Sequence, residues 1–212
     1  MGASEVFLAK LLVVLASLWA VVALTVQVVL AWGGGRTDYS RRAGNPLRAA
    51  LYNFTAAMTP AHKESVRNHP REFAVGMLMH AGVILAGAGV LLLVIWPEAG
   101  EDLLLYGRPL LWLALLANLA LLVRRALSPS LRAISSPDDY LASAATAGFL
   151  ALASLPPWTS QQSVFLIYTA LLLVYLPLGK LRHAVFFFLA RGDLGARLGH
   201  RGVYPPPQTE TE

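Results

Sequence analysis

The chain has 212 residues, of which 56% are hydrophobic and only 14% are charged, whereas a soluble globular domain usually carries about 25% charged residues. With a mean hydropathy of +0.56, this composition argues against an ordinary soluble enzyme and against a disordered chain. The sequence contains no cysteine, which excludes disulfides, thiolate-ligated zinc, cysteine-held iron–sulfur clusters and covalently attached c-type haem within it.

Apolar residues are grouped in five blocks, without the alternation that is typical of membrane strands. The blocks cover residues 6–32, 73–96, 103–123, 141–157 and 163–190. A bilayer core of about 30 Å needs roughly 20 helical residues; the fourth block is short, but a span there keeps the topology consistent. The first block is too long for a signal peptide and lacks a basic start. We therefore predict an all-α membrane protein with five transmembrane helices.

Basic residues gather on one side of the predicted membrane. The segments 33–72, 124–140 and 180–201 carry fifteen of the 17 Lys and Arg residues, and the other side carries only Lys10 and Arg108. By the positive-inside rule, this predicts an external N-terminus and a cytoplasmic C-terminus. The net charge of +5 is therefore a topology signal and not a nucleic-acid footprint. We predict a membrane domain over residues 1–195 and a basic, proline-rich cytoplasmic tail over residues 196–212.

The first inner segment contains a predicted helix over residues 46–58, which Pro46 can open. Apolar residues recur at intervals of 4, 3 and 4 on one helical face: Leu47, Leu51, Phe54 and Met58. Because Arg48 stands beside this face, we predict an amphipathic interfacial helix that lies along the membrane.

Two of the five histidines lie within predicted spans, His80 in the second and His183 in the fifth. An ionisable residue within a span is a functional-site hypothesis. His80 follows Arg71 by 9 residues and His183 precedes Arg191 by 8, or roughly 13 and 12 Å along a helix. Similar depth in the inner half of the bilayer suits the two axial positions of one haem iron. A soft metal site without haem, or hydrogen bonds to neighbouring helices, are the alternatives.

The surroundings of both histidines allow a haem pocket. Gly82 and Gly87 leave room for a macrocycle, or for a neighbouring helix at close range. The cations nearest to the two histidines, suited to haem propionates, are Arg71, Lys180 and Arg182. Three further residues of the inner segment are either solvated interface residues or a quinone-binding or proton-transfer site: His69, His62 and Lys63.

Several motifs carry a resemblance to a known family. The final span reads P-x-x-K-L-x-H over residues 177–183, and the segments PAHKESVR at 60–67 and SSPDDY at 135–140 precede the second and fourth spans. With five spans and one histidine in the second, residues 5–195 resemble the nitrate reductase gamma-subunit family, in particular cytochrome b subunits of heterodisulfide-reductase-like and Dsr/Tmc-type complexes. The resemblance implies a membrane anchor that binds b-type haem and links a quinone pool to a cytoplasmic iron–sulfur partner.

The sequence departs from this family at two positions. Members of this family that bind two haems carry a second histidine in the second span, ten residues after the first one. They carry another in the fifth span, about 18 residues before the last one. Here Val90 and Phe165 occupy these positions. We therefore expect one haem b, no outer haem, and no quinol site of the kind that the family places beside it.

The resulting prediction is a haem b subunit of a respiratory redox complex in a prokaryotic cell membrane. It would pass electrons between menaquinone or ubiquinone and a cytoplasmic iron–sulfur subunit, without being catalytic alone. The partner is expected on the inner face, which has most of the extramembrane polypeptide, at Asp138, Asp139 and Tyr140. The rival class is a non-haem anchor that only docks a partner. A small transporter is disfavoured because the sequence has no internal repeat.

Overall fold

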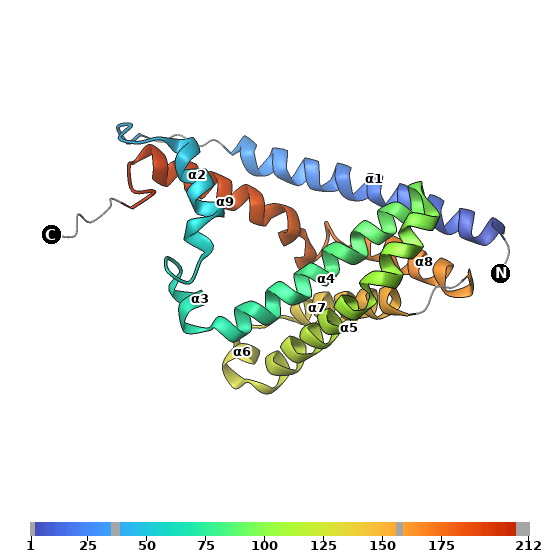
Figure 1. Ribbon diagram of the computed structural model, residues 1–212. Coiled ribbons are helices and arrows are strands. Elements are labelled where there is room, and N and C mark those ends of the chain that lie inside the picture. Colours follow the sequence, from blue (N-terminus) through green and yellow to red (C-terminus); the bar gives the residue numbers. More distant parts are fainter. Residues whose placement is uncertain (1–2, 35–38, 156–158, 207–212) are drawn as a thin grey trace. The chain divides into compact units, whose positions relative to one another are not determined.

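The computed structural model describes residues 3–34, 39–155 and 159–206, and every regular element within these ranges is helical (Figure 1). The predicted all-α class is confirmed for this part of the chain. The elements in order are α1 (Ala3–Gly33), α2 (Pro46–Phe54), η1 (Ala56–Met58), α3 (Glu64–Asn68), α4 (Pro70–Ile95), α5 (Pro97–Leu127), α6 (Pro129–Ala133), α7 (Pro137–Ser154), α8 (Thr159–Tyr175), η2 (Lys180–Arg182) and α9 (His183–His200).

Prolines determine where many of these helices begin. The helices α2, α4, α5, α6 and α7 all start at a proline, because the first helical position needs no N–H donor and the fixed φ of proline already suits the helix. At α2 the side chain of Asn45 accepts a hydrogen bond from the backbone N–H of Arg48 at 3.1 Å. The predicted opening of a helix at Pro46 is therefore confirmed, but its predicted end at residue 58 is wrong: α2 ends at Phe54, Thr55 leaves the helical conformation, and Ala56–Met58 form η1.

Three helices are long and apolar enough to cross a membrane: α1, α4 and α5. The pair α8 and α9 adds a fourth candidate when it is counted as one interrupted span. The short helix α7 is not among these candidates, since Asp138 and Asp139 occupy its first turn. Length and composition thus support three to four spans in a membrane protein, fewer than the predicted five.

The fifth predicted span is not one continuous helix. α8 ends at Tyr175, and turns over residues 176–179 lead to η2 and α9. Pro177 has no N–H to extend the helical ladder. The N–H groups of Leu178 and Gly179 both donate to the carbonyl of Tyr175, at 2.9 and 3.0 Å. The indole of Trp19 in α1 donates to the carbonyl of Val174 at 3.2 Å.

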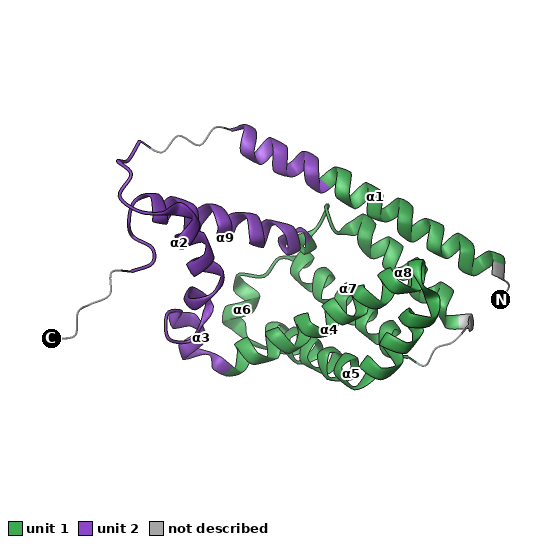
Figure 2. Cartoon of the chain, turned by 45° about the horizontal axis from the view of Figure 1, so that its top comes forward, with its two compact units in different colours: residues 1–23, 71–181 green, residues 24–70, 182–212 purple. Residues whose placement is uncertain are grey.

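The chain divides into two compact units (Figure 2). The first unit comprises residues 1–23 and 71–181, and the second comprises residues 24–70 and 182–212. The predicted boundary at 195/196 lies inside α9, and residues 207–212 of the predicted tail lie outside the described residues.

The first unit is built around an apolar core. Large buried side chains from four of its helices fill this core, among them Leu93, Leu111, Leu150, Phe165 and Leu166. Helices α4 and α5 run side by side (Figures 1 and 2), and Gly82 and Gly89 of α4 lie against Ala114 and Leu104 of α5. Such small residues let helix backbones approach closely.

The second unit has a different kind of interior. Its helices α2 and α9 pack together through small residues: the backbone of Gly195 faces Ala49 and Ala50, and that of Gly199 faces Ala49, Asn45 and Pro46. The buried residues of α2 are Ala49 and Asn53, and those of α9 are Gly195 and Gly199.

Candidate functional site

The helix α4 presents two different faces. One face is buried and packs against α5, and it includes Gly82, Ala86 and Val90. A side chain at position 82 would overlap Ala114. Of the two alternatives considered for Gly82, the structure therefore supports helix packing and not a haem pocket.

His80 lies on the other face of α4 and is exposed. Its Nδ1 lies 2.7 Å from the backbone carbonyl of Gly76, one turn earlier in the same helix. A carbonyl can only accept, so Nδ1 carries the proton and Nε2 keeps its lone pair in the neutral ring. Histidines that ligate metals commonly donate their second N–H to such a group, which fixes the orientation of the ring.

The surface around His80 is open. A side chain added at Gly76 or Gly87 would meet nothing within 4 Å. These glycines stand four residues before and seven after His80, which is the same helical face. Ile84, between them, is 71% exposed. A flat apolar group could lie along this face, so the residues present fit a macrocycle on the Nε2 side of His80.

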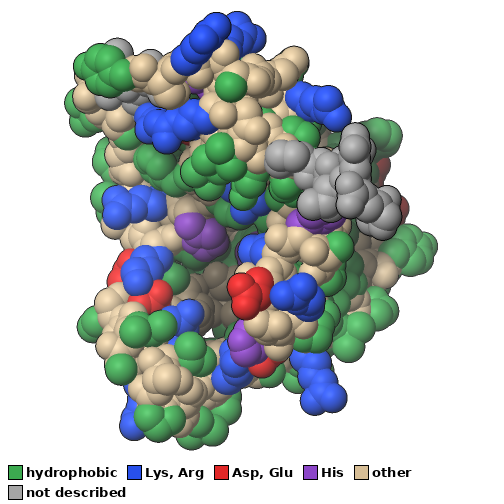
Figure 3. Space-filling view, turned by 90° about the vertical axis from the view of Figure 1, so that its left-hand side faces the viewer, with side chains coloured by type: hydrophobic (Ala, Val, Ile, Leu, Met, Phe, Trp, Pro, Cys, Tyr) green, Lys and Arg blue, Asp and Glu red, His purple; other side chains and the backbone are tan. Residues whose placement is uncertain are grey.

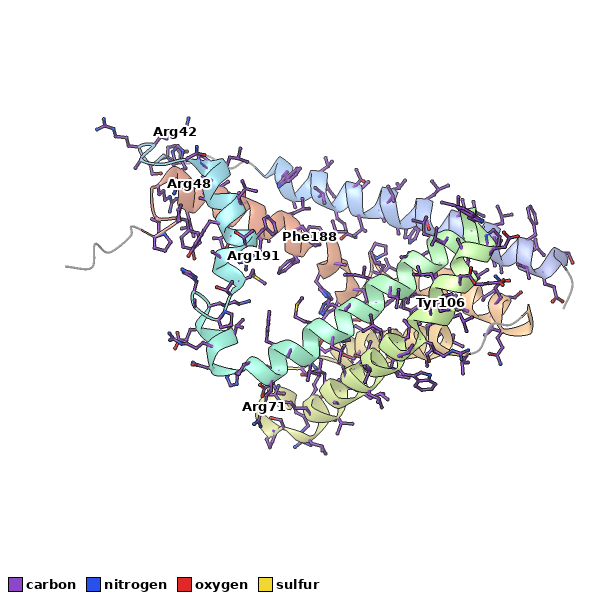
Figure 4. The ribbon with its side chains drawn as sticks, viewed as in Figure 1. Arg42, Arg48, Arg71, Tyr106, Phe188 and Arg191 are labelled. Atoms are coloured by element: carbon purple, nitrogen blue, oxygen red, sulfur yellow. The ribbon has the colours of Figure 1, made fainter. Side chains whose placement is uncertain are left out.

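His183 is the first residue of α9 and is exposed. It belongs to the second unit, whereas His80 belongs to the first. Each histidine is thus placed within its own unit, and their pairing at one iron stays a prediction. The three predicted propionate partners are placed as follows: Arg71 is exposed in the first turn of α4 (Figure 4), and Lys180 and Arg182 form η2 with Leu181.

The two carboxylates at the start of α7 bind groups within the first unit. Asp138 accepts hydrogen bonds from the hydroxyl of Tyr175 and from the backbone N–H of Lys180, the latter at 2.8 Å. Asp139 accepts from Ser136, completing a capping box, and pairs with the ammonium of Lys180 at 2.5 Å. Together they hold the interruption after α8 against α7.

The charge on Asp139 is strongly favoured. The Lys180 ammonium and the backbone N–H of Ser136 lower the pKa of Asp139 to about 2, against a smaller opposing effect of burial. Because its carboxylate already has these partners, Asp139 has a structural role in the isolated chain. Contact of Asp138, Asp139 and Tyr140 with another subunit stays a prediction.

A polar contact that the sequence did not reveal joins α2 and α9. The buried amide of Asn53 donates to the carbonyl of Arg191 at 2.7 Å. In return, the guanidinium of Arg191 donates to the carbonyl and to Oδ1 of Asn53, from Nε at 3.0 Å and from Nη2 at 2.9 Å. Figure 4 shows Arg191 and Phe188 projecting from α9. Only spatial proximity across 138 residues identifies this pair.

The three inner-segment candidates are not brought to one point. His62 lines a cavity of about 1100 Å³ in the second unit, together with Tyr52 and Arg48. Lys63 and His69 flank the short helix α3 as its caps and do not line this cavity. Of the three candidates, His62 is the one that lines this cavity.

The two positions where histidines would hold a second haem are filled by packed apolar side chains. Val90 and Phe165 are 6% and 4% exposed, and both belong to the core of the first unit. The ring of Phe165 stacks on that of Phe149, with centroids 5.6 Å apart.

Within the described ranges, no three His, Asp or Glu side chains are grouped for a metal ion; an axially ligated haem needs only two histidines. Comparison of the chain with family models, with curated proteins and with solved structures gave no match. The functional assignment therefore depends on the residues themselves.

Proposed function

We propose that this chain is a haem b-binding membrane subunit of a respiratory redox complex, resembling the nitrate reductase gamma-subunit family. His80 and His183 are its two axial ligands, and Arg71, Lys180 and Arg182 serve the propionates. The spans number five, with the N-terminus outside and the C-terminus in the cytoplasm of a prokaryotic cell. When bound, the haem supplies one-electron transfer between membrane quinone and a cytoplasmic iron–sulfur subunit.

One observation carries the proposal: the arrangement of His80 in an apolar helix. Its Nδ1–H is held by the carbonyl of Gly76 at 2.7 Å, and its Nε2 is directed away from that bond. The adjacent surface is left open by Gly76 and Gly87. An exposed imidazole in a 26-residue apolar helix is costly in lipid unless something binds it.

The proposed stoichiometry is one haem per chain. Val90 and Phe165 offer no ligand atom, and both are packed in the core of the first unit. A second macrocycle there would require that core to open. The chain's own part in electron transfer is to position the haem, to exclude water from its surroundings and to tune its potential by charge and burial.

The proposed docking surface for the iron–sulfur subunit is the inner face, near Asp138, Asp139 and Tyr140. The start of α7 and η2 are tied together there by the Asp138 and Asp139 hydrogen bonds. Such a rigid surface can present the segment after α8 to a partner.

The test is the visible spectrum of the full chain purified from a haem-replete bacterial host. We expect reduced bands of low-spin haem b and one haem per chain by pyridine haemochrome. His80→Ala and His183→Ala should each abolish the low-spin spectrum, and the exposed His69→Ala, outside the spans, should keep it. A featureless spectrum of the unmodified chain would instead establish the non-haem anchor.

A further inference from the structure

The second unit contains a cavity of about 1100 Å³ beside α2. Its polar lining comes from three segments distant in sequence: α2, the connection to α3, and the segment after α9. The side chains with donor groups are those of Asn45, Arg48, Tyr52, Thr55, His62 and Tyr204. None of the described lining residues is acidic, so the cavity is suited to an anionic ligand and not to a metal cation.

Aromatic rings give this cavity a defined wall. The ring of Tyr52 packs edge-to-face against those of His62 and Tyr204, with centroids 5.8 and 5.3 Å away and interplanar angles of 88° and 69°. The Nδ1 of His62 is in turn 3.3 Å from the hydroxyl of Thr59. Edge-to-face packing of this kind fixes ring orientation, so the hydroxyl groups are held by packed rings and not by mobile side chains.

The outer face of α2 is apolar and largely exposed, although the ring of Phe54 at its end stacks on that of Phe188 in α9, with centroids 6.2 Å apart. Leu47, Leu51 and Phe54 are 71%, 60% and 38% exposed, whereas Ala49 and Asn53 on the opposite face are buried. An amphipathic helix of this form rests with its apolar face at the boundary between acyl chains and head groups. Arg48 adjoins this face and also lines the cavity (Figure 4), so the cavity opens at head-group depth.

The two units differ in net charge. By sequence, the second unit has ten basic and five acidic residues, and the first has seven of each, so the whole net charge of +5 belongs to the second. Figure 3 shows Lys and Arg side chains standing among hydrophobic ones on the face that it presents. Basic residues beside an apolar face are attracted to anionic lipid head groups.

From these features we infer that the cavity is a binding site for the phosphodiester head group of an anionic phospholipid. The guanidinium of Arg48 donates to the phosphate, and the hydroxyls of Tyr52 and Tyr204 donate to the remaining head-group oxygens. The acyl chains follow the exposed face formed by Leu47, Leu51 and Phe54. None of the lining residues is a proposed haem ligand, so this inference does not depend on a haem.

The test is calorimetric titration of the full chain, in nonionic detergent, with dioctanoyl phosphatidylglycerol and with dioctanoyl phosphatidylcholine. We expect measurable binding of the first lipid and at least tenfold weaker binding of the second. Arg48→Gln should weaken phosphatidylglycerol binding roughly tenfold or more, because a charge-assisted hydrogen bond is lost. The matched control Arg132→Gln removes the same charge from an exposed position in α6 and should change affinity less than twofold.

A second variant keeps the inference testable if Arg48→Gln fails to fold. Tyr52→Phe keeps the ring contacts and removes only the hydroxyl, and it should weaken binding roughly two- to tenfold. Equal losses in Arg48→Gln and Arg132→Gln, or equal affinity for the two lipids, would overturn the inference. So would displacement of the lipid by millimolar inorganic phosphate, which would indicate a free-anion site, or by a short-chain quinone, which would indicate a quinone site.

Discussion

The two units of this chain hold their helices together in different ways. The first unit has equal numbers of acidic and basic residues, and it combines a core of large apolar side chains with glycine contacts between α4 and α5. The second carries the net charge, and its α2–α9 contact consists of glycine and alanine backbone surfaces plus the Asn53–Arg191 hydrogen bonds. A large apolar core can repack around a changed side chain, whereas a contact between backbones has little room to adjust.

The largest expected effect comes from Gly199→Ala. The added methyl group would overlap Ala49 and lie 2.8 Å from the carbonyl of Asn45. Both neighbours belong to the start of α2 and have little freedom to move. We therefore expect the free energy of unfolding of the second unit to fall by about 3 kcal/mol. Hydrogen exchange of the α2 amides should accelerate, while that of α4 and α5 should stay unchanged.

Gly192→Ala is the matched control in the same helix. There the added methyl group would meet only Phe54, at 3.8 Å. Replacing glycine within a helix is then favourable by about 0.5–1 kcal/mol. Equal destabilisation by both substitutions would show that the contact between α2 and α9 does not depend on close backbone approach.

A smaller loss of second-unit stability is expected from Asn53→Ala. It removes the two hydrogen bonds of the Asn53 side chain and leaves the Arg191 carbonyl without its amide donor, which costs about 2 kcal/mol. Asn118→Ala in the first unit offers a comparison, because this buried amide has one bond to the carbonyl of Ser143 at 2.9 Å. Limited proteolysis should show exposure of the second unit for Asn53→Ala only.

Asp138→Ala is expected to lower the free energy of local opening of the segment after α8 by about 1 kcal/mol. The backbone N–H of Lys180 would lose its acceptor, now 2.8 Å away, and so would the hydroxyl of Tyr175. Exchange of the Lys180 amide should accelerate about fivefold to tenfold. Ser130→Ala, at an exposed position in α6, should leave that amide unchanged.

The smallest expected effect is a loss of first-unit stability at low pH. Since the pKa of Asp139 is lowered from 3.8 to about 2, its contribution is fully present above pH 3.8 and is lost as the pH falls toward 2. Lys180 is half exposed, so solvent screening limits how much the ion pair contributes to stability. Lys180→Gln should shift the loss to higher pH, as measured by acid unfolding in detergent. An unchanged acid transition would show that the pair does not set this pKa.

Local features of the fold could be predicted from sequence, and long-range ones could not. The helical blocks and the start at Pro46 follow from composition and from the chemistry of proline. The break of the predicted fifth span near Pro177 could not be predicted, because its stabilisation depends on Asp138, which lies far away in the sequence. The Asn53–Arg191 pair depends likewise on a tertiary contact.

The same limit applies to the candidate site. His80 could be identified as an ionisable residue in an apolar helix, and its bond to Gly76 follows from the i−4 spacing. The different surroundings of the two glycines could not be predicted. Gly82 faces a neighbouring helix and Gly87 faces open space, although the two look alike in sequence. Rotation of the helix about its axis decides which glycine is covered.

The end of α8 has a consequence for how the first helix finds its place. Because the Leu178 N–H donates to Tyr175, the carbonyl of Val174 loses the donor that a regular helix would have supplied. In lipid, such a carbonyl needs another partner, and the indole of Trp19 supplies it at 3.2 Å. The break at the end of α8 thus leaves an acceptor that α1 can use. The hydrogen bond from Trp19 favours the depth and rotation of α1 that bring the indole to this carbonyl.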